Sequence, residues 1–222
     1  MEALVDYVIY LSIRGESERR LIAAAIDQLG YDDSQPPPEL RLSSQDTGLE
    51  GSRTVRETIV AVAKSWQAAA DAVVPAEGWK ELQGEPLRQS IARGHDLFHG
   101  QIANCVGCHG PAGNGQAITV DYDDWAKEYS TRLGVTPTDR EAMRPFRSAG
   151  ALPPRQTEPR KLDDGVFRGA GDPEAIFRQI SQGIAGTPMP SVQISSGDSD
   201  RGTGLTTQQA WDLVRYVRSL GN

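Results

Sequence analysis

The sequence Cys105-Val106-Gly107-Cys108-His109 holds the only two cysteines of the chain, three positions apart and followed at once by a histidine. Two thiols at this spacing can each add to one vinyl group at the edge of a haem, and the adjacent imidazole is then held beneath the iron. With two cysteines only, no disulfide framework can stabilise the fold. The motif therefore predicts covalent haem attachment at Cys105 and Cys108, with His109 as an iron ligand.

Two other interpretations of the motif stay open at this point. A thioredoxin-type redox pair has the same cysteine spacing, although it needs a strand and helix context that the flanking residues do not indicate. A zinc site needs four ligands, which the two cysteines could supply together with His95, His99 and His109. In either case the chain would be a cytosolic thiol or zinc protein without haem.

Composition limits the remaining function classes. The chain has 222 residues with 23 Lys and Arg against 30 Asp and Glu, which gives a net charge of −7. This acidic balance argues against a partner such as duplex DNA, because a protein that binds phosphates needs a basic face. A membrane span needs about 18 or more residues with few or no charges, and Lys64 interrupts the best candidate between Ile59 and Val74. We therefore expect no nucleic-acid partner and no transmembrane segment in this chain.

Helical patterns fill the part of the chain before the motif. Residues 1 to 12 have apolar side chains at helical spacing, and residues 17 to 29 predict a second helix that ends at Gly30. The stretch from Asp33 to Gly51 is rich in Pro, Ser, Gln and Asp and predicts an exposed loop or linker. Residues 52 to 73 again predict a helix. We expect residues 13 to 84 to form a helical linker without a catalytic or metal-binding set.

The pattern changes from Glu85 onward. A short amphipathic helix before the motif has Gly94 in its interior, where glycine costs about 1 kcal/mol relative to alanine and usually permits a close approach by something bulky. Asp172 predicts the cap of a helix over residues 174 to 182. Thr206 and Gln209 stand at capping-box spacing before the last helix. Shorter helices are also expected near residues 124 to 133 and 139 to 148.

The first and last helices share a pattern, which we name the helix repeat. Five residues recur at the same spacing: Leu4, Val5, Tyr7, Val8 and Leu11 in the first helix, and Leu213, Val214, Tyr216, Val217 and Leu220 in the last. Two amphipathic helices could share these residues by chance. The more specific interpretation is that residues 1 to 12 are the closing helix of an earlier copy of the domain that ends at Asn222.

With these features in place, the sequence resembles the class I type cytochromes c over about residues 85 to 222. The resemblance rests on a helix with Gly94 and Phe98, on the attachment motif, on the glycine-rich turn from Gly110 to Gly115, on Met189 within Thr187-Pro188-Met189-Pro190, and on the closing helix with Leu213, Tyr216 and Leu220. It implies an all-α fold around one covalent haem c per chain, in which the first and last helices cross at the glycine. Residues 116 to 157 look like an insertion.

The resemblance also implies the axial ligands of the iron, with His109 proximal and Met189 distal. A thioether is a soft, neutral ligand that stabilises ferrous iron and raises the reduction potential. Met189 lies between two prolines, which fix φ and stiffen the loop, so that its sulfur can be presented at little entropic cost.

Other distal ligands are available in the sequence. Met1 is terminal, and Met143 falls in a predicted helix among arginines. His95 and His99 lie on the entry helix and could line the rim of a haem pocket. A change of ligand from thioether to imidazole would lower the potential, so the choice decides the redox range of the protein.

Residues around the ligands carry less specific signals. The proximal imidazole needs a carbonyl that accepts its other N–H, and Pro111 or Pro159 is the expected source. Pro159 and Leu162 resemble a proline and leucine pair that lies between the motif and the methionine in this family. Arg160, Lys161 and Arg168 could pair with the haem propionates, or could be ordinary solvated cations.

These features predict a one-electron carrier and not an enzyme in its own right. The iron would cycle between ferric and ferrous states and relay electrons between redox protein partners, a membrane-associated respiratory complex among the candidates. The alternative is an electron-entry haem domain of a larger oxidoreductase or of a diheme peroxidase-like enzyme.

The resemblance implies a periplasmic or otherwise extracytoplasmic location, because haem is attached to such motifs outside the cytoplasm. The first residues offer no basic export signal, since Glu2 and Asp6 stand where basic residues would be expected. We therefore expect the native reading frame to extend upstream and to contain another attachment motif.

Overall fold

The computed structural model describes residues 2–29, 49–69, 71–116, 121–125, 127, 134–148, 150–169, 171–195 and 204–221. It divides into two compact units. Unit 1 comprises Met1–Val73 and Trp125–Arg155, and unit 2 comprises Val74–Asp124 and Gln156–Asn222. The predicted helix end at Gly30 and most of the expected linker between residues 33 and 51 lie outside the described residues.

Unit 1 begins with one long helix, α1 (Glu2–Leu29), where two separate helices were predicted. The expected break after residue 12 is wrong, because nothing in the joint ends a helix. Gly15 costs about 1 kcal/mol in a helix interior, which neighbouring turns can tolerate. Ion pairs one turn apart span the joint, from Arg14 to Glu18 and from Arg20 to Glu16.

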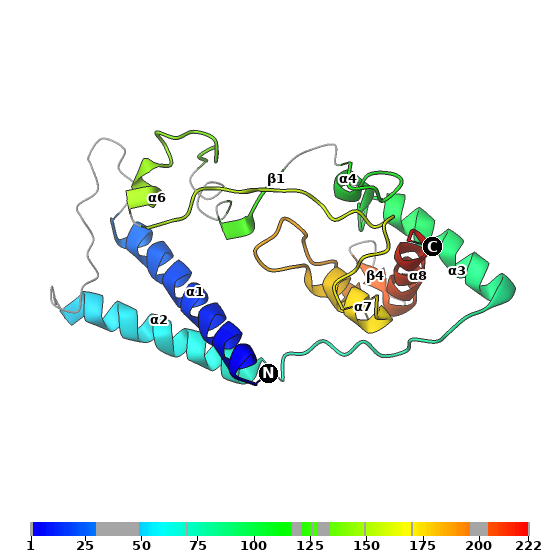
Figure 1. The fold of residues 1–222 in the computed structure, drawn as a ribbon, viewed down its shortest axis with the longest axis horizontal. Coiled ribbons are helices and arrows are strands. Elements are labelled where there is room, and N and C mark those ends of the chain that lie inside the picture. The colour runs from blue at the N-terminus through cyan, green and yellow to red at the C-terminus, as the bar shows by residue number, and fades with distance from the viewer. Residues whose placement is uncertain are drawn as a thin grey trace. The chain divides into compact units, whose positions relative to one another are not determined.

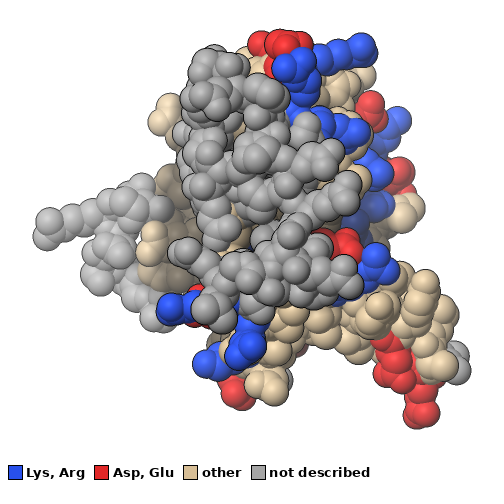
Figure 2. All heavy atoms as spheres, turned by 90° about the vertical axis from the view of Figure 1, so that its left-hand side faces the viewer, with Lys and Arg blue, Asp and Glu red and all other residues tan. Residues whose placement is uncertain are grey.

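The second helix of unit 1, α2 (Leu49–Ala68), packs on α1. Val62 is fully buried, and the Trp66 indole N–H donates to a carboxylate oxygen of Glu16 at 2.9 Å. The helix ends five residues before the predicted end at Val73. In Figure 2, basic and acidic side chains alternate over the upper right of the face that is drawn, whereas acidic side chains lie apart from them at the lower right.

A small hydrophobic cluster completes unit 1. It lies beside α6 (Arg144–Ser148), which is shorter than the helix predicted over residues 139 to 148. Its buried members are Met143, Phe146 and Ala151, and Ile22, Ala23 and Val135 pack against them. The cluster thus packs α6 and the residues around it against α1.

Unit 2 is built on two helices that lie side by side, α3 (Gly84–His99) and α8 (Thr207–Ser219) (Figure 1). They cross at Gly94, which is buried. A Cβ on this glycine would lie 2.7 Å from the Cβ of Tyr216 and would collide with the backbone carbonyl of Asp212. Only glycine allows the two backbones this approach, so the crossing expected at Gly94 is confirmed.

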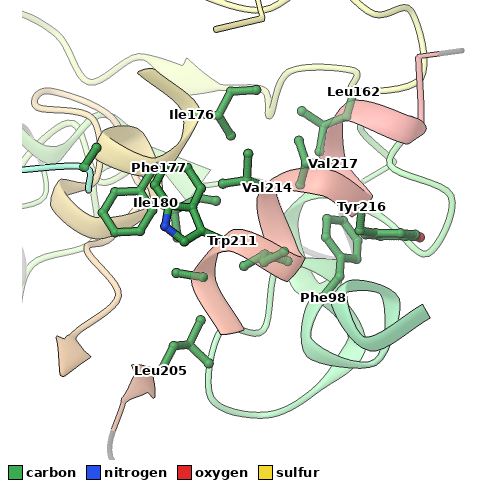
Figure 3. Close-up of a cluster of buried hydrophobic side chains, with 13 residues drawn as sticks. Phe98, Leu162, Ile176, Phe177, Ile180, Leu205, Trp211, Val214, Tyr216 and Val217 are labelled. Atoms are coloured by element: carbon green, nitrogen blue, oxygen red, sulfur yellow. The ribbon is translucent and has the colours of Figure 1, made fainter. Parts of the chain in front are cut away.

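The core of unit 2 surrounds the inner face of α8 (Figure 3). Trp211 stacks on Phe177 of α7 (Pro173–Gln182) with ring centroids 4.4 Å apart, and Tyr216 meets Phe98 of α3 edge to face at 5.3 Å. Aromatic pairs in these geometries add about 0.5–1.5 kcal/mol each beyond their area burial. The three helices α3, α7 and α8 therefore share one aromatic core.

A buried polar network links α3 to α8 beside this core. The carboxylate of Asp212, 2% exposed, accepts hydrogen bonds from Ser90, from Arg93 at 2.7 Å and from Gln208 at 3.2 Å. Arg215, 6% exposed, donates to Ser90, and its Nε has no hydrogen-bond partner among the described residues. Burial lowers the pKa of the Arg215 guanidinium, against the opposing effect of Asp212.

The extended segment between α2 and α3 belongs to unit 2, which starts at Val74 and not at the predicted boundary of residue 85. The backbone carbonyl of Glu77 accepts from the Trp211 indole at 2.9 Å, and that of Lys80 accepts from Arg215 at 2.7 Å. The ring centroids of Trp79 and Trp211 lie 5.2 Å apart. The Arg215 guanidinium lies over the Trp79 ring, 4.5 Å from its centroid. These contacts explain why the segment stays on α8.

The helix starts predicted from capping residues are confirmed. The Asp172 carboxylate accepts from the backbone N–H of Ala175 at the start of α7. At the start of α8, the Thr206 hydroxyl accepts from the Gln209 N–H, and the Gln209 side chain accepts from the Thr206 N–H. Both sets satisfy backbone donors that a helix N-terminus leaves without partners.

Strands are few and short. β1 (Asp121–Tyr122) pairs antiparallel with β2 (Gln156–Thr157), and β3 (Ile194–Ser195) pairs parallel with β4 (Leu205–Thr206). With helices as its main elements, the chain has the all-α fold class that the sequence predicts. Among the described residues, no helix combines the length and the apolar character needed to cross a membrane.

Candidate haem-binding site

The two cysteines lie on a single turn of helix, α4 (Val106–His109), for which Cys105 is the N-cap. The backbone N–H groups of Cys108 and His109 both donate to the carbonyl of Cys105, at 3.2 and 2.9 Å. The Cys105 side chain is half-buried and Cys108 is exposed. Burial raises the pKa of the Cys105 thiol to about 11. One helical turn therefore presents both sulfurs and the imidazole together.

The ring of His109 is oriented by a backbone carbonyl. Its Nδ1 lies 3.0 Å from the carbonyl oxygen of Arg160, and burial lowers the pKa of the imidazole, against the opposing effect of this hydrogen bond. An Nδ1–H that donates to the carbonyl leaves Nε2 as the nitrogen that can bind a metal. The carbonyl comes from Arg160, so the prediction of Pro111 or Pro159 as its source is wrong. Pro159 is the residue directly before Arg160.

The glycine-rich turn after the motif joins α4 to the core. The Gly115 N–H donates to the His109 carbonyl at 2.9 Å, and the Leu162 N–H donates to the Gly113 carbonyl at 2.6 Å. Leu162 is buried in the hydrophobic core of unit 2. The turn and the segment with Arg160 are thus hydrogen-bonded to each other, which places the Arg160 carbonyl beside the imidazole.

Met189 lies in a tight loop that follows α7. Its N–H donates to the Thr187 hydroxyl at 3.3 Å, and its carbonyl accepts from the Ile184 N–H at 3.2 Å. Gly183 ends α7 with φ of +69°, and a Cβ there would lie 2.6 Å from the Met189 carbonyl oxygen. The backbone around Met189 is therefore held on both sides, and its half-buried side chain packs against the core of unit 2.

The other side chains that the sequence offers as distal ligands lie in different surroundings from Met189. Met143 is 3% exposed inside the hydrophobic cluster of unit 1, whereas His109 belongs to unit 2. The two ring nitrogens of His99 lie 2.9 and 3.1 Å from the carbonyls of His95 and Pro111. His95 Nδ1 lies 3.2 Å from a carboxylate oxygen of Asp96. Met1 is outside the described residues.

The cations proposed for the propionates lie at the surface, in the segment whose Arg160 carbonyl meets His109. Arg160 is exposed, and its guanidinium donates to the carbonyl of Val166 at 3.3 Å. Lys161 and Arg168 are exposed as well. Pro159 is half-buried directly before Arg160, where its ring fixes φ next to the residue whose carbonyl meets the imidazole.

The donor set of unit 2 fits a covalent haem. Cys105, Val106 and Met189 all pack against the same hydrophobic core, so the attachment turn and the methionine loop border one apolar region. That region includes Leu162, Phe98 and Tyr216. A pair of thiols can attach a c-type haem, and an oriented imidazole and a thioether are groups that can ligate its iron. Within the described residues, no three His, Cys, Asp or Glu side chains gather where they could hold a metal ion.

Two features of the site have no signal in the residue pattern. The carbonyl that orients His109 is a backbone group of residue 160. Any residue type at this position would provide the same carbonyl, so the sequence carries no signal for it. The buried pair Asp212 and Arg215 looks like the polar face of an amphipathic helix. Trp79 was the one available indication that the segment before α3 packs on the core, because large aromatic residues are usually buried.

A family model for cytochrome c matches residues 91–221 of the chain. The match covers more than half of the chain and contains the attachment turn, the methionine loop and α8. The chain therefore belongs to the cytochrome c family. Membership implies a covalently bound haem c and a function in haem-based electron transfer.

Among solved structures, the chain is similar to one chain of the reducing HAO-like protein complex Kustc0457/Kustc0458 of Kuenenia stuttgartiensis. The two are 23% identical with a TM-score of 0.39, and the similarity covers 76% of this chain and 61% of that chain. The chain thus spans less than two thirds of the length of this neighbour. A search of the curated proteins finds no match.

Proposed function

We propose that the protein is a one-electron carrier in which His109 and Met189 ligate the iron of one haem c attached to Cys105 and Cys108. The observation that carries the proposal is the 3.0 Å contact between His109 Nδ1 and the Arg160 carbonyl, since it leaves Nε2 for the iron. The chain has two cysteines, so this motif attaches one haem in the 222 residues.

Each residue has a separate role in this account. Bound haem supplies the couple between ferric and ferrous iron. The Arg160 carbonyl fixes the tautomer and orientation of His109 and increases the basicity of Nε2. The bonded loop from Ile184 to Met189 holds the thioether in place, which favours the ferrous state. If His109 and Met189 both ligated the iron, oxygen and peroxide would find no vacant site there.

Surface residues and location complete the proposal. Arg160, Lys161 and Arg168 neutralise the haem propionates, and Pro159 keeps the backbone before Arg160 in place. The partners are redox proteins, a membrane-associated respiratory complex among them. The proposed location is periplasmic or otherwise extracytoplasmic, because haem is attached to such motifs outside the cytoplasm.

The test is a potentiometric titration of haem-loaded protein that was matured with a cytochrome c assembly system. Met189→Ala should remove the spectroscopic signature of thioether ligation and lower the reduction potential, and Met189→His should keep two axial ligands at a lower potential. Met143→Ala is the matched control, because that methionine is buried in unit 1, and its potential should stay that of the wild type.

An unchanged spectrum and potential in Met189→Ala would contradict the ligand assignment. Another side chain would then be the distal ligand, with His95, His99 and Met143 as the candidates. The same titration in Met143→Ala identifies or excludes one of these three directly.

A further inference from the structure

The first three turns of α1 expose a set of apolar side chains. All residues from Glu2 to Ser12 are exposed. The members of the helix repeat in this helix are Leu4, Val5, Tyr7, Val8 and Leu11, and they are 67%, 53%, 57%, 54% and 43% exposed. Soluble proteins rarely leave such a contiguous apolar set uncovered, so it marks an interaction surface.

The corresponding members of the helix repeat in α8 are buried. Leu213 and Val214 are fully buried, and Tyr216 and Val217 are 8% and 6% exposed. Leu220 packs against the same core. The two helices thus carry the same five side chains at the same spacing, covered in α8 and uncovered in α1.

The chain itself shows what covers such a helix. In unit 2, α3 crosses α8 at Gly94, close to the Cβ of Tyr216, and Phe98 packs edge to face on the Tyr216 ring. Leu220 lies against Gly113, in the turn that follows the attachment motif. A glycine-bearing helix followed by an attachment motif is therefore the partner that this set of side chains fits.

Charge indicates a basic side chain on the covering helix. In unit 2, Arg93 of α3 pairs with Asp212 of α8 at 2.7 Å. The charged residues of α1 before Arg14 are Glu2 and Asp6, both acidic and both exposed. In the alignment of the helix repeat, Asp6 stands opposite Arg215 and Ala3 opposite Asp212. An arginine or lysine on the covering helix would therefore pair with Asp6 one turn away from the position that Asp212 occupies in α8.

We propose that residues 2–11 are the closing helix of a second cytochrome c domain of the same polypeptide. Its opening helix lies N-terminal to residue 2, because the opening helix α3 precedes the closing helix α8 along the chain in unit 2. The covering helix carries a glycine opposite Tyr7 and a basic residue near Asp6. The inference rests on the proposed function, since the second domain is expected to hold its own haem c.

The first experiment counts haem in the native gene product. The polypeptide is purified from the cells that make it, and covalent haem by pyridine haemochrome is divided by protein from amino-acid analysis. Two or more haems per polypeptide support the proposal. One haem per polypeptide overturns it and leaves the proposed function intact, whereas no haem overturns both.

The second experiment compares two tyrosines of the native gene product. Tyr7 and Tyr10 are each 57% exposed here, but only Tyr7 belongs to the helix repeat, and Tyr10 stands opposite Ser219 in the alignment. Tyr7→Asp should reduce the haem content from two to one, and Tyr10→Asp should leave it at two. Equal haem content in both variants would overturn the proposal.

A milder pair of substitutions guards against a general loss of folding. Val8 belongs to the helix repeat and Ile9 does not. Val8→Ala should lower the urea midpoint of the unfolding transition that is followed at the second haem, and Ile9→Ala should leave that midpoint in place. An equal shift in both variants would contradict the proposed covering helix.

Discussion

At the scale of single residues, unit 2 depends on a glycine at position 94. A side chain there would meet the backbone of Asp212 and the Cβ of Tyr216, neither of which can rotate away. Because α3 and α8 hold the attachment turn and the core together, a small change at this position reaches the haem site. Gly183 has a similar role for the loop with Met189.

We therefore predict that Gly94→Val lowers the free energy of unfolding of the haem-loaded protein by about 3 kcal/mol, through overpacking against backbone. Urea unfolding followed by haem absorption measures it. Gly15→Ala is the control, because a Cβ at this helical glycine meets nothing within 4 Å. The control should leave unit 2 unchanged and stabilise α1 by about 1 kcal/mol. Comparable losses in both variants would contradict the close approach at Gly94.

At the scale of elements, the junction of α3 and α8 contains a buried ionic network. Asp212 is the common acceptor for Ser90 and Arg93 and lies 3.7 Å from Arg215. Removing its carboxylate would leave the buried guanidinium of Arg215 without its counter-charge. Breaking a buried pair in this way costs more than losing a surface pair.

Asp212→Ala should accordingly destabilise unit 2 by about 3–5 kcal/mol. Glu85→Ala breaks the exposed ion pair between Glu85 and Arg88 within α3 and should cost less than about 1 kcal/mol. Thermal unfolding monitored by circular dichroism would show the difference. If the two variants unfolded at the same temperature, the network would not carry the stability that we assign to it.

The start of α8 supports a second prediction at this scale. Thr206→Ala removes the acceptor for the Gln209 N–H and should cost about 1 kcal/mol. Thr207→Ala changes the neighbouring threonine, to which no cap hydrogen bond is assigned, and should cost less. Urea midpoints of the two variants test this, and a larger loss in Thr207→Ala would refute the capping box.

The sequence predicts those parts of the fold and site that depend on side-chain identity. The attachment motif, the caps at Asp172 and Thr206, and the crossing at Gly94 each require a particular residue type, so each leaves a readable pattern. The continuity of α1 was missed: two helices were predicted, whereas ion pairs one turn apart continue a single helix across the joint. The place of Arg160 in the site was assigned to its side chain, although the contact to His109 is made by its backbone.

At the scale of the whole molecule, the limits of unit 2 also depend on backbone groups. The segment from Val74 to the start of α3 is held by carbonyls of Glu77 and Lys80 and by the ring of Trp79. An extended segment has no helical periodicity, so the sequence assigned these residues to the linker predicted over residues 13 to 84. Unit 2 is therefore larger at its N-terminal side than the resemblance to cytochromes c implies.

Trp79→Ala should lower the stability of unit 2 by about 2–3 kcal/mol, because Trp211 loses one of its aromatic neighbours and Arg215 loses the ring beneath it. Trp125→Ala removes a tryptophan that is 50% exposed in unit 1 and should change haem-monitored unfolding by about 0.5 kcal/mol or less. Equal effects would place residues 74–83 outside the folded unit.

The account as a whole requires that a porphyrin is bonded to two sulfurs of α4. Peptide mass spectrometry of the mature protein after protease digestion tests this most directly. We predict that the peptide with Cys105 and Cys108 carries the added mass of one haem and that neither thiol reacts with iodoacetamide. A peptide of unmodified mass, with both cysteines alkylated, would contradict the assignment of the site and the proposed electron transfer through it.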